Sequence, residues 1–553
     1  MKRILIVAVV FMFVAGASGQ HQHPPAGDAK PATLISGLGD VRHPLSTTNA
    51  EAQRFFNQGL ALVYGFNHEE AVKAFTRAAE LDPQLAMAHW GVALALGPNI
   101  NMPIDAQREK AAYEAIQRAR ALASKASETE RAYIEALSKR YSNDQKADLR
   151  KLDIEYRNAM AELVRRYPDD LDVATLYAES IMDLNPWQFW NKDGKPAEGT
   201  EEMVSVLESV LRRNPDHIGA NHYYIHAVEA SPHPEWALPS AQRLKSLAPA
   251  AGHLVHMPAH IDIRSGNYEA AARSNAYAAE ADRELFKIAG QQGMYPMMYY
   301  SHNLHFLAVA HSMQGRYEDS KRAADQLHNH LSQHLQGSGP MFEAILPMLD
   351  AFMPTPILIM VRFNRWDDIL KLPAPDQRLV VNTALWRFGR AMAFASTGKL
   401  DSAEKERTDL LSAVKATPAD RPYGFNTAVN VLSIAQNMVN ARIATAKNDK
   451  PGAIEFLRKA LEVEDKLNYD EPEDWYIPVR ESLGAALMLN GDFVGAEKVF
   501  RAELAKHLRN GRALFGLMES LRAQGKKDAA AHIQMEFEAA WKNAEVKPRL
   551  EDL

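Results

Sequence analysis

Histidine is concentrated in the middle of this chain. Ten of the twenty histidines lie between His217 and His311, in under a fifth of the sequence. Imidazole is the commonest protein ligand for metals and titrates nearest to neutral pH. The clustering therefore indicates a chemical role, either metal binding or the binding of an anionic or small molecule. The candidate ligands come from the stretches NHYYIHAVEA, GHLVHMPAHI and SHNLHFLAVA, and they are His222, His226, Glu229, His253, His256, His260, His302 and His305.

The types of these residues limit the metal that they would hold. The chain contains no cysteine, so thiolate ligands are excluded. Imidazole and carboxylate suit zinc, copper(II), nickel, manganese and iron(II), and we expect a divalent transition metal, zinc or copper. His222, His226 and Glu229 have a helical ligand spacing, but they do not form the HExxH motif because no glutamate follows the first histidine.

Length and charge narrow the class of protein. A chain of 553 residues is too long for one ordinary globular core, unless it is a repeat array that grows in one dimension. The formal net charge of −6 is mild for this size and gives no basic face. We therefore expect no nucleic-acid partner.

The N-terminus has the features of a secretory signal. Lys2 and Arg3 precede the apolar run ILIVAVVFMFV, and Ala17-Ser18-Gly19 supplies small residues for cleavage before Gln20. We expect a signal peptide over residues 1–19, a periplasmic or secreted protein, and no membrane span in the mature chain, since the apolar run is short for one. Residues 20–47 are rich in proline, glycine and small polar residues, which predicts a flexible linker.

A helical repeat follows the linker. Small residues, an aromatic residue and a closing proline recur at fixed spacing, at Gly59, Ala71, Phe75, Ala78 and Pro83, and again at Gly484, Ala496 and Phe500. Small residues let two antiparallel helices approach, the aromatic ring fills the space between them, and proline ends the second helix. The segments SGNYEAA, QGRYEDS, TGKLDSA and NDKPGAI show the turn of further units.

These spacings resemble the tetratricopeptide repeat (TPR) family over most of residues 48–540. The resemblance implies an all-α, right-handed superhelical solenoid of about ten TPR-like helical hairpins, which binds a protein, peptide or small ligand in its concave groove. We divide the array into N-terminal repeats with a tryptophan-containing insert (48–217), histidine-rich central repeats (218–340) and C-terminal repeats (341–553).

The repeat register places the histidines. Three successive units are expected to begin at Ile218, Gly252 and Ser301. Positions two, five, nine and twelve of a unit share one face of its first helix, which in TPR proteins lines the groove. The histidines and the glutamate occupy the second place (His253, His302), the fifth (His222, His256, His305), the ninth (His226, His260) and the twelfth (Glu229). Neighbouring first helices stand roughly 8–10 Å apart, so these side chains are expected to converge.

Two inserts adjoin the histidine units. MDLNPWQFWNKDGKPAEGT precedes the first of them, and FKIAGQQGMYPMMYY directly precedes Ser301. Long inserts in compact arrays are often functional, although apolar packing between repeats explains the same residues. We expect a groove wall or lid made of Trp187, Trp190, Tyr295, Tyr299 and Tyr300.

The sequence thus predicts an exported solenoid with a histidine-rich transition-metal site at its centre. One alternative is a plain protein-interaction scaffold without metal, in which the histidines only form hydrogen bonds. A second alternative is a metal-dependent hydrolase. We do not expect an enzyme, because the chain has no GxSxG elbow, P-loop or dinucleotide motif, and by analogy helical arrays mostly bind partners.

Overall fold

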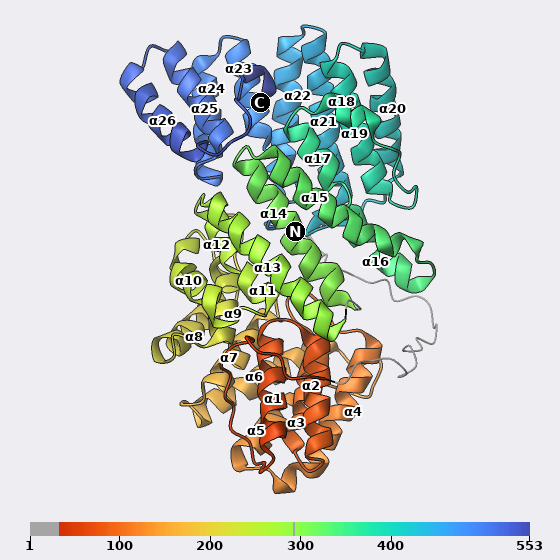
Figure 1. Cartoon of the computed structure of the whole chain (residues 1–553), viewed down its shortest axis with the longest axis vertical. Helices are drawn as coiled ribbons and strands as arrows, with labels where there is room; N and C mark the ends of the chain where they lie inside the picture. Colours follow the sequence, from red (N-terminus) through yellow and green to blue (C-terminus); the bar gives the residue numbers. More distant parts are fainter. Residues whose placement is uncertain (1–31, 291–292) are drawn as a thin grey trace, which may run out of the picture. The chain divides into compact units, whose positions relative to one another are not determined.

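The computed structural model describes residues 32–290 and 293–553, and these are built almost wholly of α-helices (Figure 1). The predicted signal peptide and the first part of the predicted linker, residues 20–31, lie outside the described residues. By its internal contacts the chain divides into two compact units. The N-terminal unit comprises residues 32–261 and 277–300, and the C-terminal unit comprises residues 262–276 and 301–553. The prediction of an all-α solenoid is confirmed.

The helices of the N-terminal unit pack as successive antiparallel neighbours. They are α1 (Ala50–Tyr64), α2 (His68–Leu81), α3 (Ala86–Leu96), α4 (Ala106–Leu122), η1 (Ala123–Lys125), α5 (Glu128–Leu137), α6 (Leu149–Arg166), α7 (Leu171–Met182), α8 (Thr200–Arg213), α9 (Ile218–Val228), η2 (Pro234–Ala237), α10 (Leu238–Leu247), α11 (Gly252–His256) and the π-helical turn η3 (Pro296–Tyr300). The boundary between the units falls within α12 (Pro258–Arg264) and α13 (Tyr268–Ala289).

One phenylalanine explains how the first repeat packs. Phe75 of α2 is fully buried, and its ring faces Gly59 of α1 and Gly91 of α3. A Cβ added at Gly59 would lie 2.6 Å from the ring, and one at Gly91 would lie 2.3 Å from it. The ring therefore occupies the space that glycine leaves on two successive first helices, as the repeat pattern predicts.

Part of the predicted linker is held against the N-terminal unit. Residues 32–47 form no helix, but Leu38 and His43 are buried. His43 Nδ1 lies 2.8 Å from Oδ2 of Asp172 on α7, and Gln58 of α1 accepts the backbone N–H of Ile35 at 2.7 Å. This segment differs from the flexible linker that we expected, because its polar groups pair with the first helices rather than with water.

The C-terminal unit continues the helical array and adds one short hairpin. Its elements are α14 (Ser301–Met313), α15 (Tyr317–Ser332), η4 (Gln333–Gln336), α16 (Pro340–Phe352), α17 (Thr355–Arg362), α18 (Trp366–Lys371), α19 (Val380–Ser396), α20 (Leu400–Ala416), β1 (Pro422–Tyr423), β2 (Asn426–Thr427), α21 (Ala428–Ala446), α22 (Lys450–Glu464), α23 (Val479–Leu489), α24 (Phe493–Lys506), α25 (Gly511–Ala523), α26 (Lys527–Ala540) and η5 (Leu550–Asp552). The strands β1 and β2 pair antiparallel, with Tyr423 opposite Asn426.

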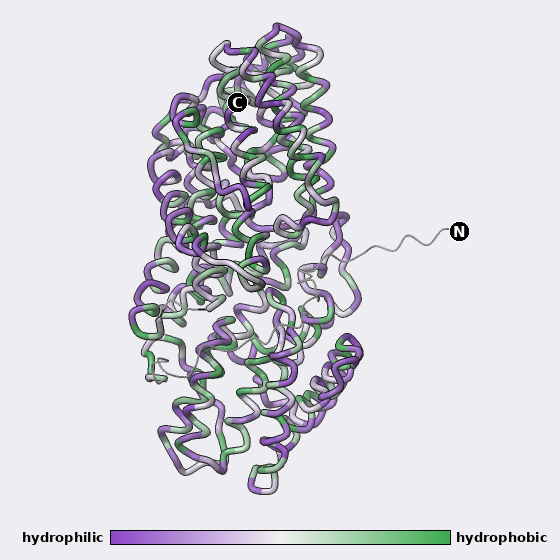
Figure 2. Tube along the Cα trace, turned by 90° about the vertical axis from the view of Figure 1, so that its right-hand side faces the viewer, coloured by the Kyte–Doolittle hydropathy of each residue, from purple (hydrophilic) through white to green (hydrophobic). Residues whose placement is uncertain are grey.

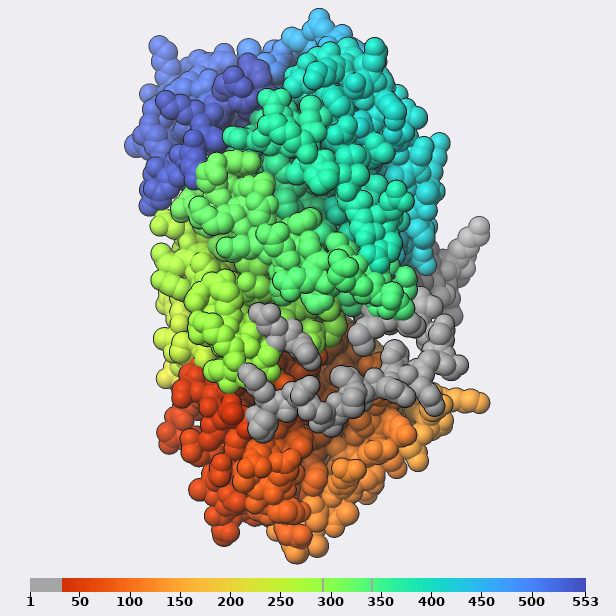
Figure 3. Space-filling view, turned by 45° about the vertical axis from the view of Figure 1, so that its right-hand side comes forward, coloured from red at the N-terminus to blue at the C-terminus, as the bar shows by residue number. Residues whose placement is uncertain are grey.

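The packing of the first repeat recurs near the other end of the chain. Phe500 of α24 is fully buried, and a Cβ at Gly484 of α23 or at Gly516 of α25 would lie 2.4 or 2.2 Å from its ring. Polar and apolar stretches alternate along the helices of each unit (Figure 2), as expected when each helix buries one face. Within each unit, consecutive segments occupy adjacent parts of the surface (Figure 3), which is typical of an array whose repeats contact their neighbours.

One stretch of the C-terminal unit is apolar enough to cross a membrane by length and composition. It spans Phe342–Arg362, and 72 % of its apolar 18-residue window is buried inside the protein. The structure interrupts it at Met353 and Pro354, between α16 and α17. Core helices of soluble proteins can be equally long and apolar, and they are buried as this stretch is.

The predicted starts of the three histidine units are confirmed, because α9 begins at Ile218, α11 at Gly252 and α14 at Ser301. The predicted central block, residues 218–340, is not one body, however. Residues 218–261 and 277–300 belong to the N-terminal unit, and the rest belongs to the C-terminal unit. Repeat spacing alone does not reveal where the packing between neighbours changes.

Candidate metal centre

Helix α9 carries two predicted ligands and is buried along its whole length. It begins at Ile218, where His217 caps it by accepting the backbone N–H of Ala220 at 3.2 Å. His222 and His226 are 0 and 2 % exposed, and their ring centroids are 4.9 Å apart. Because positions i and i+4 share a helical face, both imidazoles project from one side of α9.

Hydrogen bonds determine which nitrogen of each ring carries the proton. His222 Nδ1 lies 2.6 Å from the carbonyl oxygen of Tyr64, and His226 Nδ1 lies 2.6 Å from Oε1 of Glu229. Both oxygens accept, so in a neutral ring each Nδ1 donates and each Nε2 keeps its lone pair. Metal-binding histidines adopt this arrangement, with the distal N–H held by a carboxylate or carbonyl.

Electrostatics keep these two rings neutral. Burial lowers the pKa of His222 well below its ordinary value, and the neighbouring His226 lowers it further. Burial also lowers the pKa of His226, although the carboxylate of Glu229 opposes this shift. Neutral imidazole is the form that binds a metal ion, so neither ring has to lose a proton at neutral pH.

His253 of α11 supplies the third imidazole. Its Nε2 lies 3.0 Å from Nε2 of His222. His222, His226 and His253 each offer one ligand atom, and the three atoms lie within 4.8 Å of one another. Nitrogens bound to one zinc ion at about 2.0–2.1 Å in tetrahedral geometry are about 3.3 Å apart. Small side-chain movements would therefore let the three rings share one ion.

The start of α11 is positioned by a close approach to α13. A Cβ at Gly252 would lie 1.9 Å from Oδ1 of Asp282, so only glycine fits there. The same oxygen accepts the hydroxyl of Tyr295 at 3.0 Å, and that hydroxyl accepts the backbone N–H of His253 at 3.1 Å. This chain of contacts holds the backbone of His253 in place.

Glu229 links α9 to α12. Its Oε1 binds His226, and its Oε2 lies 2.5 Å from Nδ1 of His260. Burial alone would raise the pKa of Glu229, but His260 and His226 outweigh burial and lower it. Glu229 is therefore a fully buried carboxylate that orients two imidazoles at once.

His256 completes a ring of five imidazoles. Its Nε2 lies 2.7 Å from Nε2 of His260. The centroid distances around this ring are 4.9 Å (His222–His226), 5.6 Å (His226–His260), 4.7 Å (His260–His256), 5.8 Å (His256–His253) and 4.8 Å (His253–His222). Five of the seven predicted histidines, together with Glu229, thus lie together in the N-terminal unit.

The two remaining predicted ligands, His302 and His305, belong to α14 of the C-terminal unit. There both line a pocket of that unit, described below.

The imidazoles do not lie on an open groove, as we expected from the repeat register. All five are at most 2 % exposed. Within the N-terminal unit, Phe66, Trp187 and Tyr299 of the first repeat and the two inserts pack against the rings of His222, His226 and His253. Aromatic side chains of this unit thus cover these three imidazoles.

The tryptophan insert forms part of this wall. The ring of Trp187 meets that of His226 edge-on at 5.2 Å, and its Nε1 donates to Asn101 at 3.1 Å. Trp190 Nε1 donates to the carbonyl oxygen of Ala227 on α9 at 2.7 Å. Both predicted tryptophans therefore contact the histidine helix or one of its side chains.

The second insert contributes two of its three predicted tyrosines. Tyr299 lies 4.7 Å from the ring of His253 and 5.1 Å from that of Tyr295, which binds the backbone of His253. Tyr300 packs instead on Phe286, at 5.5 Å. The π-helical turn η3 explains the difference, because it directs successive residues to different sides.

Two residues of the first repeat were missed by sequence reasoning. The ring of Phe66 lies 4.5, 5.9 and 5.5 Å from those of His222, His226 and His253, and the carbonyl of Tyr64 holds His222. Phe66 occupies the turn between α1 and α2 with a φ of 55°. No spacing rule connects such a turn to histidines more distant in the chain, so the sequence held no signal for this contact.

The comparison with known protein families agrees with the repeat packing. The family model of the tetratricopeptide repeat matches residues 52–85, which cover most of α1, the whole of α2 and the turn that follows them. These residues form one tetratricopeptide repeat, and the same packing of a phenylalanine between two glycines recurs at Phe500. A TPR solenoid of this kind is suited to binding proteins or other ligands.

Solved structures with similar architecture are distant in sequence. The human IFIT1 dimer with m7Gppp-AAAA is 11 % identical, with 90 % of this chain and 91 % of that chain covered and a TM-score of 0.32. Yeast Tom70 is 12 % identical, with 88 % and 90 % covered and a TM-score of 0.31. At these values neither structure bears on what this chain binds. No curated protein matches its sequence significantly.

Proposed function

We propose that this protein binds a divalent transition-metal ion, zinc or copper(II), through Nε2 of His222, His226 and His253. The supporting observation is that three buried imidazoles offer ligand atoms within 4.8 Å of one another. In two of them the distal Nδ1 is held by an acceptor, which directs the Nε2 lone pair to the ion. Nε2 of His226 is buried without a hydrogen-bond partner among the described residues, which is costly unless a ligand occupies that position.

The donor set suits a borderline metal. Three neutral nitrogens and a nearby carboxylate favour zinc or copper(II) over calcium and magnesium, which prefer oxygen. Bound there, the ion supplies a positive charge that compensates the buried carboxylate of Glu229. The charge reaches Glu229 through the ring of His226, whose N–H the carboxylate accepts.

The role that we propose for the ion is structural. A hydrolytic site needs an open coordination position that water and substrate reach. The imidazoles are at most 2 % exposed, which favours a closed site over the hydrolase alternative. We propose that the ion fixes α9 against α11, and that the array so stabilised binds a protein, peptide or small ligand, as TPR proteins typically bind proteins or peptides.

Metal analysis of the purified protein tests this proposal. The protein is purified without metal-affinity resin, dialysed against zinc or copper(II) and then against buffer, and its metal content is measured by mass spectrometry. His226→Ala removes one ligand. His233→Ala is the matched control, because the side chain of His233 is 53 % exposed and pairs with Glu235 outside the cluster.

We expect one bound ion per chain in the parent and in the control, and its loss in the His226 variant. A parent that takes up no metal would support the alternative of a plain interaction scaffold. Equal metal content in all three proteins would place the ion elsewhere and refute the site.

We also propose that the chain is exported to the periplasm or secreted. The basic start, the short apolar run and the small residues before Gln20 carry this proposal, together with the absence of cysteine, which is compatible with it.

A further inference from the structure

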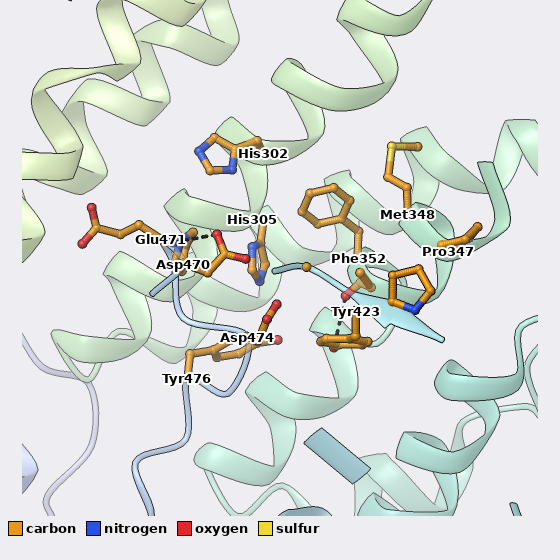
Figure 4. Close-up of a pocket in the computed structure, with 14 residues that line it drawn as sticks. His302, His305, Pro347, Met348, Phe352, Tyr423, Asp470, Glu471, Asp474 and Tyr476 are labelled. Carbon is orange, nitrogen blue, oxygen red and sulfur yellow. Dashed lines mark hydrogen bonds between the residues drawn. The ribbon is translucent and has the colours of Figure 1, made fainter. Parts of the chain in front are cut away.

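The C-terminal unit holds a pocket of about 100 Å³ that the metal proposal does not involve. Its walls come from α14, α16, β1 and the segment between α22 and α23. Figure 4 shows His305, Asp470 and Asp474 near its centre, with Phe352 and Tyr423 beside them. Among the described residues that line this pocket there is no lysine or arginine.

His305 presents an unused nitrogen to this pocket. Its side chain is 8 % exposed, and its Nε2 is buried without a hydrogen-bond partner among the described residues. In the tautomer with the proton on Nδ1, Nε2 accepts a hydrogen bond from a ligand.

Two carboxyl groups face the same space. A Cβ at Gly424 would lie 2.0 Å from Oδ1 of Asp474 and 2.6 Å from Oδ2 of Asp470, so both oxygens converge on one point of the pocket wall. Their other oxygens are anchored: Asp470 Oδ1 accepts the backbone N–H of Glu471 at 2.8 Å, and Asp474 Oδ2 accepts the Nδ2 amide of Asn426 at 2.7 Å. The Glu471 side chain extends away from this pair (Figure 4).

The two carboxyl groups form a hydrogen bond with each other, which requires that they share a proton, and Asp470 also accepts the backbone N–H of Phe425. Burial raises the pKa of Asp470 to about 7, and burial together with Asp470 raises the pKa of Asp474 well above its ordinary value. Buried carboxyls that repel each other retain a proton unless a cation compensates them. The pocket therefore favours a positively charged ligand over an anionic one.

The rest of the pocket is aromatic and apolar. The ring of His305 meets those of Phe352 and Tyr476 edge-on at 5.4 and 5.2 Å, and Tyr423 lies on the β1 side. Aromatic faces attract cations and also cover a short alkyl chain. A volume of about 100 Å³ holds roughly seven water-sized groups. The ligand is therefore small and partly apolar.

We propose that this pocket binds a primary alkylammonium ion, which replaces the proton shared by Asp470 and Asp474 and donates its three N–H groups to Nε2 of His305 and to one oxygen of each carboxyl group, while the proton is released to solvent. A primary ammonium matches the three acceptors in number. Its alkyl chain lies against Phe352 and Tyr423. The site rests on residues of the C-terminal unit alone and does not depend on the proposed metal.

Calorimetric titration with n-butylammonium chloride at constant ionic strength tests this inference. We expect binding of the full-length protein with a Kd of about 1 mM, as is reasonable for five heavy atoms. 1-Butanol has the same length without charge and is expected not to bind under these conditions. Tetramethylammonium has the charge without N–H donors and is expected to bind at least about tenfold more weakly.

Two variants separate the site from general charge effects. Asp474→Asn keeps the shape but removes one of the two carboxyl groups that compensate the bound cation, and it is expected to weaken butylammonium binding about tenfold. Asp465→Asn removes a carboxyl group before the same segment, where Asp465 pairs with Arg480 outside the pocket, and it is expected to have no effect. His305→Phe is expected to weaken binding as well, and thermal melting checks that each variant is folded.

Several results would overturn the inference. The inference is wrong if 1-butanol binds as tightly as butylammonium, or if the Asp474 and His305 variants both bind butylammonium as tightly as the parent. It is also wrong if the folded parent gives no heat of binding. Displacement of butylammonium by calcium at equal ionic strength would identify the pocket as a metal site instead. Loss of metal in His226→Ala with retained butylammonium binding distinguishes this inference from the proposed function.

Discussion

Glu229 is the residue whose replacement probes the metal centre most sharply. In the parent one carboxylate accepts N–H groups from His226 at 2.6 Å and from His260 at 2.5 Å. Glu229→Gln keeps the shape but replaces one accepting oxygen with a donating NH₂ group. The ring that faces this NH₂ must then accept on Nδ1 and carry its proton on Nε2, where it no longer binds a metal.

The size of the effect follows from the role of such partners. Loss of a hydrogen-bond partner of a metal-binding histidine costs roughly 10- to 100-fold in affinity, or about 1.4–2.8 kcal/mol. If His260 meets the NH₂ group instead of His226, the loss falls to the lower end of this range, because His260 is not one of the three proposed ligands. We therefore expect zinc affinity to fall at least about tenfold.

Competition with a chromophoric zinc chelator at fixed pH measures this change. Glu235→Gln is the control, because Glu235 pairs with the exposed His233 and lies outside the cluster. The stability of the metal-free protein provides a second readout: the lowered pKa of Glu229 shows that the fold stabilises its charge, so Glu229→Gln is expected to lower this stability at neutral pH. Unchanged zinc affinity in a folded Glu229→Gln variant would refute the assigned tautomers.

Three further predictions concern the fold and the fate of the chain. Phe75→Ala is expected to destabilise the protein by about 3–5 kcal/mol in urea unfolding, since its ring is fully buried between two glycines. Tyr277→Ala, at a 63 % exposed position, is the control and should have little effect. Equal unfolding midpoints for the two variants would contradict this account of the packing. Burial alone would lower the pKa of His507, but Glu473 and Glu503 raise it from 6.5 to about 10. The protonated imidazole therefore stabilises the fold fully below about pH 6.5, and this stabilisation is lost as the pH rises through about 10. The melting temperature of the parent should therefore fall more steeply over this range than that of His507→Gln, and identical slopes would show that the charge contributes nothing. N-terminal sequencing of the protein from the periplasm or medium should start at Gln20, whereas an intact Met1 in the cytoplasm would refute export.

The sequence was most informative where spacing reflects packing. The pattern of Gly59 and Phe75 predicted the helical hairpin, because a ring fits only where the facing helix lacks a side chain. The register then predicted the starts of α9, α11 and α14 to the residue. A periodic pattern constrains both the helix and its neighbour, so these predictions did not need three-dimensional information.

The parts of the candidate site that the sequence did not reveal depend on contacts between distant segments. The ring of Phe66 packs against His222, and the backbone carbonyl of Tyr64 accepts a hydrogen bond from the same histidine. Tyr64 and His222 are 158 positions apart in the chain. The assignment of His302 and His305 to another unit depends on where the array changes its packing, which no local pattern encodes. The closure of the site likewise arises from the folding of the inserts over α9.

Anomalous diffraction from crystals of the metal-loaded protein, collected at the zinc or copper absorption edge, tests the central claim most directly. We expect one strong peak about 2.0–2.1 Å from Nε2 of His222, His226 and His253, in the interior of the N-terminal unit. The absence of a peak at these three nitrogens, or a peak only at surface residues, would contradict the proposed metal centre.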